Sequence, residues 1–292
     1  MVVIMRKITI YEVGPRDGLQ NIDYIVPTET KLHLIDTLQK SGLRNIEVTS
    51  FAHPKLLPQM SDAEEVFRGQ GSALVMNQKG MERALDADVT HFNIVFSPSE
   101  EFNQRNLGCD LNTAIARYAK MLEGVPKNNV RVYISCFFGC PYEGIIPKSK
   151  LERAVVTAKL FGSTVVLCDT VGVANIPDIQ YAAAMTHQYD VKAALHLHHE
   201  RDRVTHALSL VRTAIDNGIT EFDSSIGGLG GCPFIEKNLG NLPTESLVVW
   251  CNAHGIDCGL VWNDLSDAMR LARDIREGFF VEAPSMSHVL PV

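Results

Sequence analysis

Short apolar runs alternate with longer amphipathic stretches along the whole chain. Eight of these runs are rich in Val, Ile and aromatic residues and have the length of buried β-strands. The predicted strands cover residues 7–13, 45–51, 72–77, 91–97, 130–136, 164–170, 192–199 and 221–226. The pattern is that of an α/β protein whose strands are separated by helices.

The stretches between the strands carry apolar residues at helical spacing. In residues 28–42, Leu32, Ile35 and Leu38 lie on one stripe, and Gly42 follows as a C-cap. Residues 110–124 and 150–162 show similar patterns, and further helical patterns near 243–254 and 264–276 come after the last strand. Eight such βα repeats without a linker predict a (β/α)₈ TIM barrel with additional C-terminal helices, as a single domain over 1–292.

The amino-acid composition limits the classes of binding partner that this barrel is expected to have. The 292 residues carry a formal net charge of −7 without a Lys/Arg cluster, which argues against a nucleic-acid or anionic-membrane partner. No apolar run reaches the length of a membrane span. The seven cysteines are scattered without a CxxC pair, as is typical of a reducing, cytoplasmic protein. The apolar tail, 278–292, is compatible with packing on the barrel, with a homo-oligomer contact or with fraying.

Catalytic groups of a TIM barrel gather where the strands end, so polar residues at those ends are expected to form one constellation. His196 and His198 alternate on the seventh strand and therefore share a face, where two imidazoles can chelate one cation. His199 points to the other face and is expected to be structural or to support the ligands without touching the cation. The alternative is that all three are only polar residues at a strand end.

Two further segments supply polar groups at the first two strand ends. In GPRDG, Asp17 is a hard oxygen ligand and Arg16 can stabilise negative charge on an oxygen, although RDG alone is also an ordinary surface turn. Glu47 lies within the second predicted strand, and a buried carboxylate needs a partner. Arg16 or a metal ligand would serve.

The segment GGLGGCP (227–233) follows the eighth strand, and its glycines allow a close approach to a ligand. Cys232 can donate a proton from this loop, or it is a bystander thiol. Asn241 offers an amide oxygen to a cation, or it is a turn former.

Together these motifs resemble the hydroxymethylglutaryl-CoA lyase family of metal-dependent barrel lyases. The matching segments are EVGPRDGLQN (12–21), IEVTSF (46–51), GCPYEG (139–144), DTVGVA (169–174), HLH (196–198), FDSSIGGLGGCPF (222–234) and LGN (239–241). The resemblance implies cleavage of 3-hydroxy-3-methylglutaryl-CoA, an acyl-CoA thioester, to acetyl-CoA and acetoacetate. It also implies a divalent cation, with Mg²⁺ or Mn²⁺ favoured by the mixed ligands.

The resemblance also implies residue roles. The metal ligands would be Asp17, His196, His198 and Asn241. Glu47 would order the metal site, Arg16 would stabilise the enolate oxygen, and Cys232 would supply the proton. The remaining active-site or substrate-contacting groups would be Glu12, Gln20, Ser50 and Asp169.

Three departures from the family pattern lie near the expected substrate. Here HxH is followed by HERDR (199–203), NLGN (238–241) replaces a small-residue loop, and Cys168 stands where a glycine is usual. Arg201 or Arg203 would meet an extra carboxylate or a CoA phosphate, or else be a solvated loop charge. The departures keep three alternatives open: a lyase for another 3-hydroxyacyl-CoA such as citramalyl-CoA or a longer branched homologue, an aldolase on free 4-hydroxy-2-oxo acids, and a barrel that only binds a ligand.

Overall fold

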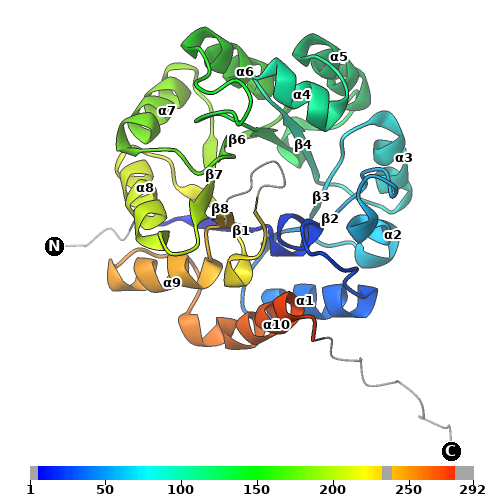
Figure 1. Cartoon of the computed structure of the whole chain (residues 1–292), viewed down its shortest axis with the longest axis vertical. Coiled ribbons are helices and arrows are strands. Elements are labelled where there is room, and N and C mark those ends of the chain that lie inside the picture. The colour runs from blue at the N-terminus through cyan, green and yellow to red at the C-terminus, as the bar shows by residue number, and fades with distance from the viewer. Residues whose placement is uncertain (1–5, 232–238, 280–292) are drawn as a thin grey trace, which may run out of the picture.

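A computed structural model describes residues 6–231 and 239–279 of the chain. Eight parallel strands pair in the order β6-β5-β4-β3-β2-β1-β8-β7, and the pairing of β6 with β7 closes them into a barrel (Figure 1). The strands are β1 Thr9–Glu12, β2 Asn45–Ser50, β3 Ser72–Leu74, β4 Phe92–Phe96, β5 Val130–Ile134, β6 Thr164–Asp169, β7 Ala193–Glu200 and β8 Glu221–Ser224. The predicted TIM barrel is confirmed.

Helices form a ring around the strands (Figure 1). They are α1 Thr28–Lys40, α2 Ala63–Val66, α3 Gln78–Asp86, α4 Glu100–Leu107, α5 Leu111–Met121, α6 Lys148–Phe161, α7 Ile176–Gln188, α8 Val204–Asp216, α9 Thr244–Ala253 and α10 Ser266–Glu277. α9 completes the last βα unit, and α10 is an extra C-terminal helix that packs against α1. No helix within the described ranges is both long and apolar enough to cross a bilayer.

The predicted stripe of α1 explains how this helix attaches to the barrel. Leu32, Ile35 and Leu38 are all buried, and Ile35 and Leu38 belong to the main hydrophobic core. The helix ends at Lys40, and Gly42 takes a φ of +96°, a conformation that favours glycine at this C-terminus. The apolar period of the sequence therefore sets both the helix and the face that it buries.

Two local features at the C-terminal mouth of the barrel were not predicted. A single π-helical turn, Gly14–Gly18, follows β1, and a short strand, β9 (Leu239–Asn241), pairs antiparallel with the end of β7. The register sets His198 opposite Asn241. These two features bring the segments after β1 and β8 to the end of β7.

Candidate metal centre and active site

Three buried side chains from distant parts of the chain converge at the mouth of the barrel. Asp17 comes from the π-helical turn, and His196 and His198 come from β7, where alternation turns both imidazoles to the same side. One ligand atom from each of the three lies within 4.8 Å of the others. A single small cation can therefore reach all three residues.

The hydrogen bonds of the two imidazoles orient them for a cation. His196 Nδ1 lies 3.1 Å from Asp223 Oδ2, and His198 Nδ1 lies 3.2 Å from the carbonyl of Thr170. Both partners are acceptors, so each ring carries its proton on Nδ1. The two Nε2 atoms face each other at 3.1 Å, where they either share one proton or direct two lone pairs at a cation. Burial, followed by the neighbouring His196, lowers the pKa of His198 to about 4, so its ring is neutral.

Asn241 completes the donor set. Its Nδ2 donates to Asp17 Oδ2 at 2.7 Å and to the carbonyl of Leu229 at 2.9 Å. Its Oδ1 is buried and has no hydrogen-bond partner among the residues that the structure describes, a costly situation for a polar atom unless a ligand satisfies it. Two imidazole nitrogens, a carboxylate and this amide oxygen fit a divalent cation.

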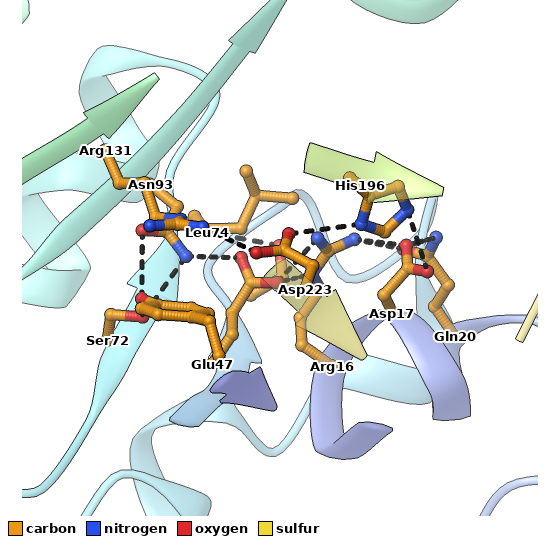
Figure 2. A network of polar contacts seen from close by, with 12 residues as sticks. Arg16, Asp17, Gln20, Glu47, Ser72, Leu74, Asn93, Arg131, His196 and Asp223 are labelled. Atoms are coloured by element: carbon orange, nitrogen blue, oxygen red, sulfur yellow. Dashed lines mark hydrogen bonds and ion pairs between the residues drawn. The ribbon is translucent and has the colours of Figure 1, made fainter. Parts of the chain in front are cut away.

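Arg16 connects the metal cluster to Glu47 (Figure 2). Its Nε and Nη2 each lie 2.6 Å from Glu47 Oε2, and its Nη1 donates to Asp17 Oδ1 at 2.8 Å. Asn93 Nδ2 donates to the other Glu47 oxygen at 2.7 Å. Burial works to raise the pKa of Asp17, but the Arg16 guanidinium and the two imidazoles bring it below its ordinary value. Asp17 is thus an ionised carboxylate beside a cationic group.

A cavity of about 1130 Å³ opens onto this cluster. Its polar wall near the metal cluster includes Arg16, Asp17, Gln20, Tyr133, Thr170, His196 and His198. Gln20 also donates to Asp17 Oδ1 at 3.0 Å, as Figure 2 shows. The outer wall extends along residues 21–25, the segment 52–59 and the start of the α4–α5 connection. The cavity is large enough to hold an extended ligand with its reactive end at the cluster.

Glu12 has a different environment from the one expected for a substrate contact. Its Oε1 accepts from the N–H groups of Gly14 and Ile226 at 2.8 and 2.9 Å, and its Oε2 accepts from the Thr244 hydroxyl at 2.6 Å. Burial raises its pKa to about 7 against the effect of these donors. Glu12 does not line the cavity and instead ties β1 to the loop after β8 and to α9.

Two other expected active-site residues also make local contacts. Asp169 accepts from the N–H groups of Val173 and Ala174, both at 3.0 Å, and burial raises its pKa to about 6. Ser50 Oγ lies 3.2 Å from the N–H of Ala52. Cys232 lies outside the described residues.

The HERDR segment has contacts that the sequence did not reveal. His199 is buried, and its Nδ1 lies 2.6 Å from the carbonyl of Glu200, away from the cavity wall. Arg201 donates to the carbonyls of Gly228 and Gly230 at 3.2 and 3.5 Å. Arg203 lies 3.8 Å from Glu200 and is largely exposed. Arg201 therefore contacts the glycine-rich loop.

Arg131 and Tyr133 were missed as polar residues of the barrel interior. Both lie on β5, both are buried, and Arg131 pairs with Asp223, the partner of His196. The alternation of VRVYI places these two residues on one face of the strand, which is the only sequence signal for them. The identity of their partners across the barrel is not encoded in that pattern.

A buried cluster of imidazoles and oxygen donors at the mouth of a (β/α)₈ barrel is typical of the metal-dependent barrel enzymes. The family model described as HMGL-like matches residues 7–273. The chain belongs to this family, that of hydroxymethylglutaryl-CoA lyase, and is a carbon–carbon lyase.

Individual relatives cover most of the chain. Mitochondrial hydroxymethylglutaryl-CoA lyase of Mus musculus is 37% identical over 283 residues, which are 92% of this chain and 85% of the relative. The solved hydroxymethylglutaryl-CoA lyase of Pseudomonas aeruginosa matches with a TM-score of 0.85 at 33% identity, covering 93% of this chain and 94% of that one. An HMG-CoA lyase from Acinetobacter baumannii in complex with coenzyme A and 3-methylmalate has a TM-score of 0.85 at 30% identity and covers 100% of both chains.

Proposed function

We propose that this protein cleaves 3-hydroxy-3-methylglutaryl-CoA to acetyl-CoA and acetoacetate with a bound divalent cation. The observation that carries the proposal is the convergence of Arg16, Asp17, His196 and His198 on one wall of a cavity large enough for an acyl-CoA. The names of the matching relatives support it. We propose Mg²⁺ or Mn²⁺ as the cation because half of its ligands are oxygen atoms.

The reaction breaks the C2–C3 bond of the substrate. A general base accepts the proton of the C3 hydroxyl, whose oxygen becomes the ketone oxygen of acetoacetate, while the electrons of the C2–C3 bond pass to C2 and form the enolate of acetyl-CoA. A divalent cation, when bound, lowers the pKa of such a hydroxyl. Arg16 stabilises the enolate oxygen, since its guanidinium is held by Glu47 and Asp17 at the cavity wall.

The acetyl-CoA enolate must be protonated at C2, and this step requires a general acid. We propose Cys232 for this role, as the resemblance to the family implies, with its thiol proton passing to C2. The two carboxylates beside Arg16 serve to hold the guanidinium. Burial raises the pKa of Glu47 against the effect of Arg16, whereas Arg16 and the two imidazoles bring the pKa of Asp17 below its ordinary value despite burial.

The cavity also favours a second candidate substrate class. Its outer wall reaches Arg105 and Arg117 and the residues between α4 and α5, so the space exceeds the immediate surroundings of the metal cluster. A lyase for another 3-hydroxyacyl-CoA, such as citramalyl-CoA or a longer branched homologue, is therefore the alternative. The bound 3-methylmalate of the Acinetobacter relative supports testing branched hydroxy acids.

We also propose that the protein acts in the cytoplasm. The six cysteines within the described ranges are all unpaired, as is typical of a reducing compartment. Relatives at similar identity include a cytoplasmic enzyme of Mus musculus, 36% identical over 265 residues that are 87% of this chain and 76% of the relative.

A panel of acyl-CoA thioesters, assayed for acetyl-CoA release with and without EDTA, tests the proposal. We expect release from 3-hydroxy-3-methylglutaryl-CoA, its loss with EDTA and its recovery with Mg²⁺ or Mn²⁺. Pyruvate release from free 4-hydroxy-2-oxo acids, without activity on any thioester, would instead identify an aldolase. The His196→Ala variant is expected to lose the bound metal, and an undiminished metal stoichiometry would contradict the assigned ligands.

A further inference from the structure

A buried arginine lies in the barrel interior beneath the metal cluster. Arg131 projects from β5, and its side chain is only 7% exposed. Its Nη2 lies 2.5 Å from Asp223 Oδ1, and its Nη1 pairs with Glu221. The guanidinium carbon lies 4.1 Å from the centroid of the Tyr11 ring and 5.7 Å from that of Tyr133. Two carboxylates and two aromatic rings therefore hold the guanidinium in one orientation.

The same contacts continue to a metal ligand. Asp223 uses its other oxygen, Oδ2, to accept from His196 Nδ1 at 3.1 Å, so this carboxylate stands between Arg131 and the imidazole (Figure 2). Asp223 is 2% exposed. The orientation of its carboxylate plane decides whether His196 keeps its proton on Nδ1 and directs Nε2 to the cation.

The two carboxylate partners of Arg131 differ in what else holds them. Glu221 also pairs with Lys192 at 2.8 Å, and Lys192 is 64% exposed, so this end of the network meets solvent at the N-terminal face of the barrel. Asp223 lies deeper in the barrel. Among the lysines and arginines that the structure describes, Arg131 is the one that forms an ion pair with Asp223. The planar guanidinium of Arg131 is bound through both terminal nitrogens, Nη1 to Glu221 and Nη2 to Asp223. It therefore restrains the Asp223 carboxylate more tightly than a lysine ammonium could.

We propose that Arg131 is a positioning residue for the metal site. It fixes the carboxylate of Asp223, and Asp223 in turn fixes the tautomer and ring orientation of His196. Arg131 itself touches neither the cation nor the substrate. The inference rests on the proposed metal site. It assigns a role in metal affinity to Arg131, which lies in the barrel interior beneath that site.

The test compares metal binding by Arg131→Met and Arg131→Lys with that of the wild type. Mn²⁺ affinity is measured by electron paramagnetic resonance, and the visible spectrum of bound Co²⁺ reports the ligand geometry. Loss of an outer partner of a ligating histidine lowers metal affinity about 10–100-fold, and we expect this for Arg131→Met. Arg131→Lys is expected to recover part of the affinity because it restores the charge without the fork.

Glu221→Gln is the matched control. It breaks the other ion pair of Arg131 inside the same barrel but leaves the contact with Asp223 in place. We expect its Mn²⁺ affinity to stay within about twofold of wild type and its Co²⁺ spectrum to be unchanged. A loss as large as that of Arg131→Met would overturn the proposal, because it would show only a general effect of disturbing the barrel interior.

Other outcomes are equally informative. Wild-type affinity and spectrum in Arg131→Met, with metal loss in His196→Ala, would overturn the role of Arg131 and leave the metal site standing. Absence of metal binding by the wild type would instead overturn the proposed function. If Arg131→Met does not fold, Asp223→Asn replaces it, because it keeps the shape and removes the charge that Arg131 holds. A wild-type affinity in Asp223→Asn would also overturn the proposal.

Discussion

The two halves of the active site are built in different ways. The floor consists of side chains from the strands and from the π-helical turn after β1, and there buried charges pair with buried charges, as Arg16 does with Glu47 and Arg131 with Asp223. The rim is the glycine-rich segment 227–231, whose backbone carbonyls accept hydrogen bonds from surrounding side chains. These contacts are Arg276 to Gly227, Arg201 to Gly228 and Gly230, Asn241 to Leu229, and Asn21 to Gly231.

This difference between floor and rim predicts which kinds of substitution each part tolerates. On the floor, the loss of one charge leaves its partner buried and unpaired, which costs about 3–5 kcal/mol. At the rim, each contact is a single hydrogen bond worth about 0.5–1.5 kcal/mol. Space is the tighter constraint there, since a Cβ at Gly230 would lie 2.5 Å from Asn241 Nδ2. The floor is therefore sensitive to charge and the rim to shape.

The largest effect is expected on the floor, from Arg16→Met. This change removes the group that we propose stabilises the enolate oxygen, and it leaves Glu47 without its cationic partner. We expect kcat to fall about 10²–10³-fold, as for the loss of one donor to a developing oxyanion, together with a lower thermal midpoint. Steady-state acetyl-CoA release and thermal unfolding measure the two effects.

Arg83→Met is the control for this prediction. Arg83 also binds a carboxylate with two nitrogens, to Glu64 at 2.6 and 2.8 Å, but that carboxylate is 45% exposed and lies outside the cavity wall. We expect a loss of stability below about 1 kcal/mol and an unchanged kcat. Similar losses in both variants would show that the floor is no more sensitive than the surface.

An intermediate effect is expected from Glu12→Gln, at the junction of floor and rim. The raised pKa of Glu12, about 7 against an ordinary 4.5, means that its protonated form is favoured by folding. Stability from this group is complete below pH 4.5 and is lost as the pH rises through 7. Glutamine stays neutral, so the stability difference between pH 5 and pH 8 is expected to shrink by roughly 2.5 kcal/mol.

Urea unfolding of both proteins at the two pH values measures this change. Glu64→Gln serves as the control, because that carboxyl is close to the surface and its pKa is lowered by Arg83. An unaltered pH slope in Glu12→Gln would mean that Glu12 is ionised in the folded protein. Its three donors would then outweigh the cost of burial.

The sequence predicted the strand-built part of the molecule well. All eight apolar runs became strands, because strands of a parallel barrel are covered on both faces and are therefore mostly apolar. Alternation also separated His196 and His198 from His199, and Arg16 was one of two partners expected for Glu47. Alternation is a local property of one strand, whereas Arg16 and Glu47 lie on different elements, so the sequence left that pairing as one of two options.

The contacts across the barrel could not be predicted in the same way. Arg131 and Asp223 are 92 positions apart in the sequence, and only the closure of the barrel brings β5 to face β8. The strand β9 was missed because three residues carry no periodic pattern. Glu12 lies at a strand end like the other expected site residues, but its carboxylate turns to backbone donors that the sequence does not reveal.

The smallest effect is expected at the rim, from Arg201→Ala. Because Arg201 holds the carbonyls of Gly228 and Gly230, its loss is expected to lower kcat about 2–10-fold with little change in KM. Arg203→Ala is the control, since this side chain is 63% exposed and lies 3.8 Å from Glu200. If Arg201 instead binds a carboxylate or phosphate of the substrate, KM rises and kcat is preserved, and added salt weakens the difference. That result would mean that Arg201 recognises the substrate and does not merely support the loop. The rim would then be sensitive to a change of charge, as the floor is.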